Sequence, residues 1–129
     1  MNATIPSKAR RQILKITRKL KRLFEKPVRV KNLQTYYRLS DGGYDKVKPS
    51  YINNETCLRN FVSQFGQKNL HLIADNVKDS TWNRINELYP SITSSRTNFG
   101  NGAASFNMAL DLALEQTECE GVYFVEDDY

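Results

Sequence analysis

Leu70-His71-Leu72-Ile73-Ala74-Asp75-Asn76, at residues 70–76, is a short apolar run that ends in two polar residues. Its length and composition are typical of a strand buried within a sheet. A second run of the same kind, Val122-Tyr123-Phe124-Val125, passes directly into Glu126-Asp127-Asp128. Both stretches predict buried strands that end in residues capable of chemistry.

Outward from these two stretches, strand patterns and helix patterns alternate. Further strands are expected over 28–39, which ends in a Ser-Asp-Gly-Gly turn, and over 92–97 at an edge. Helices are expected over 8–25, 55–65, 81–88 and 103–116. The regular alternation predicts an α/β fold with a mostly parallel sheet and helices on both faces, a Rossmann-like half-domain preceded by a basic amphipathic helix.

Cap residues and core faces follow from the same patterns. The expected caps are Ser7 for the first helix, Asn53 or Asn54 for the second, and Asp79 or Ser80 for the third. The core face expected for the last helix consists of Phe106, Leu110, Ala113 and Leu114.

Charge divides the 129 residues into a basic segment, 1–26, and a body, 27–129. The segment holds nine Lys/Arg against one Glu, whereas the body holds ten Lys/Arg against thirteen Asp/Glu. The body therefore gives little electrostatic support to nucleic-acid binding. The helix over 8–25 suits an anionic membrane surface, and packing of its apolar stripe on the body or on a partner is an equal alternative. Nucleic-acid binding by this helix ranks third.

Several classes of protein are disfavoured. No apolar run approaches the roughly 20 residues that span a bilayer, and basic residues interrupt the stretch where a signal peptide would be apolar. Cys57, Cys119 and the single His71 do not form a conventional zinc site. The sequence predicts a reduced, cytoplasmic protein, with peripheral contact at a membrane surface as the variant that the basic helix allows.

The polar ends of the expected strands form the candidate site, because ligands bind at the carboxyl ends of strands in open α/β sheets. Glu126 and Asp128 point to one side of a strand end, where two carboxylates can share Mn²⁺ or Mg²⁺ with diphosphate oxygens. The Asn/Gly-rich loop 98–102 presents backbone N–H groups before a helix, which favours an anion. The alternatives are a solvated acidic tail and, for Asp75, an Asx turn. No P-loop or GxGxxG pattern occurs.

This order of motifs resembles the nucleotide-sugar glycosyltransferases of the A-type fold, in particular the family-two group of inverting enzymes. The resemblance covers about residues 35–129. It rests on four segments: Tyr37-Arg38-Leu39-Ser40-Asp41, the strand that ends at Asp75, the Asn98-to-Asn107 loop and helix start, and the DxD-like Glu126-Asp127-Asp128.

The resemblance implies transfer of a sugar from a nucleoside-diphosphate donor to a hydroxyl on a glycan or other acceptor. The residues that it implies for donor binding are Tyr37, Arg38, Ser40, Asp41, Asp75, Gly100, Asn101, Gly102 and Asp127, with Glu126 and Asp128 as metal ligands. The catalytic base is expected beyond Tyr129, so the chain is expected to be a fragment that contains the donor-binding half.

Departures from the family pattern affect three segments. The family's acidic pair on the second strand is reduced to Ala74-Asp75. The helix segment that carries a cation in the family reads Ser105-Phe106-Asn107, and Arg96 is the candidate to substitute for that cation. The metal motif opens with Glu126 instead of Asp. The alternative functions are a nucleotidyltransferase and a non-enzymatic module that docks through the basic helix.

Overall fold

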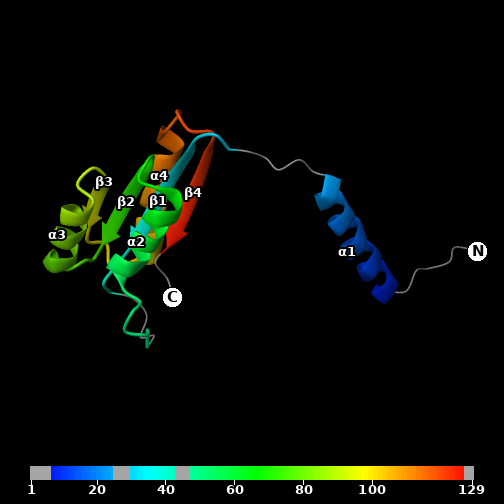
Figure 1. The fold of residues 1–129 in the computed structure, drawn as a ribbon, viewed down its shortest axis with the longest axis horizontal. Helices are drawn as coiled ribbons and strands as arrows, with labels where there is room; N and C mark the ends of the chain where they lie inside the picture. Colours follow the sequence, from blue (N-terminus) through cyan, green and yellow to red (C-terminus); the bar gives the residue numbers. More distant parts are fainter. Residues whose placement is uncertain (1–6, 25–29, 43–46, 127–129) are drawn as a thin grey trace, which may run out of the picture.

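The computed structural model describes residues 7–24, 30–42 and 47–126, and within them helices and strands alternate after a first helix (Figure 1). The elements are α1 (Ser7–Phe24), β1 (Leu33–Leu39), α2 (Asn54–Phe65), β2 (Leu70–Asp75), α3 (Asp79–Leu88), β3 (Thr93–Thr97), α4 (Gly102–Glu115) and β4 (Gly121–Glu126).

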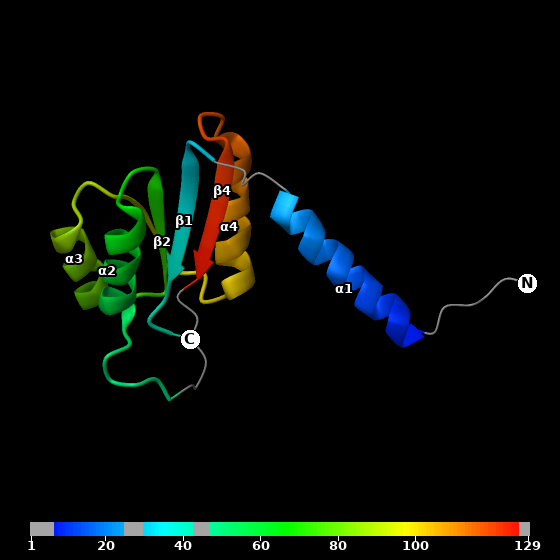
Figure 2. The ribbon, with the colours of Figure 1, turned by 45° about the vertical axis from the view of Figure 1, so that its right-hand side comes forward.

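The four strands form one sheet in the order β3-β2-β1-β4, and every neighbouring pair is parallel. Helices α2 and α3 cover one face of this sheet, and α4 covers the other (Figure 2). The predicted α/β class, with a parallel sheet between two helical layers in a Rossmann-like arrangement, is confirmed. The edge strands differ in character, because β3 reads Thr-Ser-Ser-Arg-Thr whereas β4 reads Gly-Val-Tyr-Phe-Val-Glu.

The start of β1 and the cap of α3 depart from expectation, whereas the cap of α2 agrees with it. The strand expected over 28–39 begins at Leu33, and residues 25–29 lie outside the described ranges. Helix α2 is capped by Asn53, whose side chain accepts from the Thr56 amide while Thr56 accepts from the Asn53 amide. The expectation that Asp79 or Ser80 caps α3 was wrong, because Lys78 occupies the cap position and its amide donates to Asp41 instead.

Each face of the sheet has its own hydrophobic core. On the side of α2 and α3 the core includes Leu58, Leu72 and Ile85, each of which is at most 3% exposed. On the side of α4 the buried core consists of Tyr36, Ile73 and Ala109, with partly buried residues such as Phe124 around it. Strands β1 and β2 contribute to both cores, since successive side chains of a strand point to opposite faces.

Helix α4 lies against the sheet through small side chains. Ser105 and Ala109 are its buried residues, and Met108 and Leu112 pack beside them. The expected core face was therefore wrong in part: Phe106 and Ala113 are partly buried, but Leu110 is 37% and Leu114 82% exposed. The sheet supplies the bulky groups at this contact, Tyr36, Ile73 and Phe124, so small residues on the helix let the two layers approach closely.

Replacing Ala109 with leucine tests this packing. We expect Ala109→Leu to lower the free energy of unfolding by about 1–3 kcal/mol, because the fully buried position has no room for three more carbons. Leu114→Ala should change it by less than about 0.5 kcal/mol. Urea unfolding measures both values, and a larger cost for Leu114→Ala would show that α4 packs through its leucine face.

His71 on β2 gives the fold a dependence on pH. Its Nε2 lies 2.8 Å from Ser95 Oγ, and burial lowers the pKa of His71 from its ordinary value of 6.5. The unfolded chain therefore takes up this proton at a higher pH than the folded protein does, so stability should fall as pH drops through 6.5. His71→Gln keeps a polar side chain and should lose this part of the pH dependence in urea unfolding. An equal loss of stability at low pH in the natural protein and in His71→Gln would assign the pH dependence to other groups.

Candidate functional site

A cleft of about 1420 Å³ runs along the carboxyl edge of the sheet. Its walls are the ends of β1, β2 and β4, the Gly100–Gly102 loop, residues in the N-terminal halves of α2 and α4, and residues of α3 as far as Ile85. The chain proceeds from β1 to β2 and β3 on one side and then returns to β4 on the other side of β1. Such a topological switch point is where open parallel sheets bind ligands.

Arg38 and Glu126 form an ion pair across this switch point. They are partners in the parallel register of β1 and β4, and Arg38 Nη1 donates to Glu126 Oε1 at 2.7 Å. Arg38 Nη2 donates to the Gly102 carbonyl at 3.0 Å, and the guanidinium lies 5.3 Å from the centre of the Phe106 ring. The Arg38 side chain is 13% exposed, and its buried Nε has no hydrogen-bond partner among the described residues.

The turn after β1 is fixed by its own side chains. Ser40 Oγ donates to the Gly42 carbonyl and accepts from the Gly42 amide. Asp41 accepts from the Asn54 side chain at 2.8 Å and from the Lys78 amide at 2.6 Å. Asp41 therefore links the turn to the starts of both α2 and α3, and this fixes one wall of the cleft.

Asp75 holds the opposite wall. The residue is 5% exposed, and its Oδ1 accepts from Thr97 Oγ1 at 2.9 Å and from the Phe99 amide at 2.7 Å. These bonds fix the start of the loop between β3 and α4. Asp75 also lines the cleft, so a carboxylate that orders the loop lies beside the space where a ligand would bind.

The loop before α4 uses a glycine and an asparagine. Gly100 has φ +61°, a left-handed conformation that favours glycine. Asn101 caps α4 by accepting from the amides of Ala103 and Ala104 at 2.8 and 3.4 Å. These two amides at the start of α4 are therefore not free for an anion, because the cap side chain already accepts from them.

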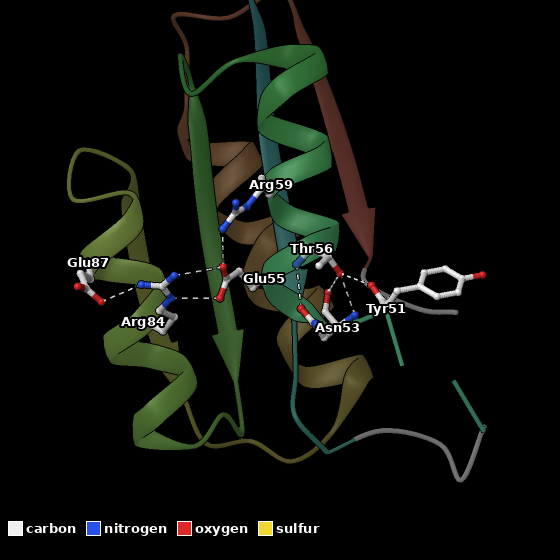
Figure 3. A network of polar contacts seen from close by, with 7 residues as sticks. All are labelled: Tyr51, Asn53, Glu55, Thr56, Arg59, Arg84 and Glu87. Carbon is white, nitrogen blue, oxygen red and sulfur yellow. Dashed lines mark hydrogen bonds and ion pairs between the residues drawn. The ribbon is translucent and has the colours of Figure 1, made fainter. Parts of the chain in front are cut away.

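A polar network between α2 and α3 borders the cleft (Figure 3). Glu55 receives hydrogen bonds from Arg84 on α3 and from Arg59 one turn along α2. The bond from Arg84 holds the pKa of Glu55 below its ordinary value. Glu55 and Arg84 both line the cleft, and neither is predictable from the sequence because their contact joins residues 29 positions apart.

The predicted donor-binding residues divide into three groups. Seven of them line the cleft: Arg38, Ser40, Asp41, Asp75, Gly100, Asn101 and Gly102. Tyr37 is 3% exposed in the core on the α2 side, edge-on to Phe61 and outside the lining of the cleft, so its contact with a nucleotide stays a prediction. Asp127 lies outside the described residues. Arg96, the candidate substitute cation, bonds Val77 O and Asp79 away from the lining.

The described part of the predicted metal site does not provide a metal-binding cluster. Among residues 7–24, 30–42 and 47–126, no three His, Cys, Asp or Glu side chains are placed to hold an ion together. Glu126 is engaged by Arg38, and Asp128 lies outside the described residues. The assignment of Glu126 and Asp128 as metal ligands therefore stays a prediction.

Comparison of the chain with protein-family models, curated proteins and solved structures finds no significant match in any of the three.

Asp75 variants separate its role in holding the loop from a role in binding. We expect Asp75→Ala to lower the free energy of unfolding by about 1–3 kcal/mol, since the Phe99 amide and the Thr97 hydroxyl both lose the acceptor of a part-buried hydrogen bond. Asp75→Asn keeps a carbonyl oxygen for both bonds and should cost less than about 1 kcal/mol. Urea unfolding gives both values, with the exposed Asp111→Ala as the control. Equal losses of unfolding free energy in the two Asp75 variants would show that the loop contacts do not account for the contribution of Asp75 to stability.

Proposed function

We propose that this chain contains the donor-binding part of a glycosyltransferase, which transfers a sugar from a nucleoside-diphosphate sugar to an acceptor hydroxyl. The observation that carries the proposal is that residues from all four motif segments of the resemblance line a single cleft at the switch point of a parallel sheet. These segments lie far apart in the sequence, and each is a weak signal alone.

Three cations and three helix N-termini of the cleft support a diphosphate as ligand, although four carboxylates, Asp41, Glu55, Asp75 and Glu126, line it too. Arg38, Lys48 and Arg84 line it, and the N-termini of α2, α3 and α4 point toward the same edge of the sheet. Helix N-termini carry partial positive charge and favour phosphate groups nearby. In the proposed reaction the acceptor hydroxyl attacks the sugar carbon, and negative charge grows on the departing diphosphate. Arg38 at the switch point is the described cation best placed to balance that charge.

The family resemblance adds a divalent cation to the proposal, and Glu126 and Asp128 are its candidate ligands. A cation at this place would supply further positive charge for the leaving diphosphate. Since Arg38 donates to Glu126, binding of a metal by that carboxylate would compete with the ion pair.

The nucleotidyltransferase alternative has less support. Such enzymes need a Gly-rich loop with a cation directly after the first strand. Here the turn after β1 is occupied by the hydrogen bonds of Ser40 and Asp41 with Gly42, Asn54 and Lys78.

Thermal unfolding with UDP, GDP and dTDP, each with Mn²⁺ or with a chelator, tests the proposal. At a hundredfold excess over Kd a ligand stabilises the fold by about 2.7 kcal/mol, which raises Tm by several degrees. We expect a rise with one nucleotide that needs Mn²⁺ and is lost in Asp128→Ala.

The matched control is Asp111→Ala, which removes an exposed carboxylate of α4 outside the cleft and should keep the full rise. A cooperative transition that no nucleotide shifts would contradict donor binding. A rise in Tm that is the same with chelator would support nucleotide binding and contradict the requirement for a metal.

A further inference from the structure

Helix α1 has a charge unlike that of the rest of the chain. Its 18 residues include no Asp or Glu and eight basic residues, which are Lys8, Arg10, Arg11, Lys15, Arg18, Lys19, Lys21 and Arg22. The rest of the chain has eleven Lys/Arg and fourteen Asp/Glu. The proposed transfer reaction assigns no role to this helix.

Three apolar side chains of α1 lie on the face opposite a basic series. Ile13, Ile16 and Leu20 are spaced by three and four residues, so they form one stripe along the helix. They are 51%, 58% and 49% exposed, and α1 lies apart from the sheet (Figures 1 and 2). The opposite face carries the basic series Arg11, Lys15 and Arg18. The stripe is therefore not covered by the described body of the protein.

An anionic bilayer complements both faces of such a helix at once. The apolar stripe enters the boundary between headgroups and acyl chains, while lysine and arginine stems reach back to the lipid phosphates. A nucleic-acid duplex would pair with the cations and leave Ile13, Ile16 and Leu20 in water. None of the helices in the described ranges is long and apolar enough to cross a membrane, so contact would be at the surface.

We propose that α1 docks the protein on an anionic lipid surface, with the helix axis in the plane of the bilayer and Ile13, Ile16 and Leu20 toward the acyl chains. Charge complementarity selects this occupant, because the helix carries positive charge only. This inference goes beyond the proposed sugar transfer and does not depend on it.

Co-sedimentation of the full chain with lipid vesicles tests the docking. We expect binding to phosphatidylcholine vesicles that contain about one quarter phosphatidylserine, and at least about tenfold weaker partitioning to vesicles of phosphatidylcholine alone. Lys15→Gln/Lys19→Gln should reduce the preference for phosphatidylserine, since both cations lie on the polar face.

A matched pair of single variants tests the stripe. Ile16→Gln should lower partitioning at least about tenfold, because it removes one of the three apolar groups that enter the lipid. Leu14→Gln makes a similar change at a side chain that is 49% exposed but lies beside Arg11 and Arg18 on the basic face. It should change partitioning less than about twofold.

Three results would overturn the proposal. Equal partitioning of Ile16→Gln and the natural chain would reduce the interaction to charge alone. A lower Tm for Ile16→Gln without lipid would show that the stripe packs on the body instead. Binding to a duplex RNA oligonucleotide with none to either kind of vesicle would assign α1 to nucleic acid. None of these results involves a nucleotide sugar, so failure of the donor-binding test would leave them unaffected.

Discussion

The parallel pairing of β1 with both β2 and β4 is the constraint on which the rest of the body depends. Because β1 lies between them, Tyr36 and Tyr37 are both only 3% exposed, one in each core. Each strand–helix connection must then begin at the same edge of the sheet, since all the strands run in one direction. The cleft, the three helix N-termini and the Arg38–Glu126 pair are consequences of that common direction.

The acidic side chains of the cleft stabilise the fold, in addition to any contact that they would make with a ligand. Asp41 links the turn after β1 to α2 and α3, Asp75 orders the loop after β3, and Glu126 joins β4 to Arg38. Carboxylates that accept several hydrogen bonds stay in place when the cleft is empty, so a ligand would meet walls that are already formed. The carboxylates that give the site its negative charge are therefore the same groups that hold its loops in place.

The fold class was predictable because alternating strand and helix patterns are local features of the sequence. The face of α4 was not, since the sequence shows where large apolar residues are but not that the opposing sheet already fills the space with Tyr36 and Ile73. The cleft residues at strand ends were predictable from topology alone. The Arg38–Glu126 pair and the Glu55–Arg84 contact were not, because both depend on register between segments that are distant in the chain.

The two edges of the sheet have unlike consequences for strand addition. An edge strand presents backbone N–H and C=O groups to any further chain, and short polar edges resist such pairing. β3 has five residues, four of them Thr or Ser and the other Arg96, so it suits a permanent boundary with solvent. β4 carries Tyr123, which is 41% exposed and lies beside Phe65. Its backbone and aromatic groups together favour pairing with another strand. Within the described ranges 30–42 and 47–126, β4 is therefore the edge of the sheet better suited to pairing with a further strand.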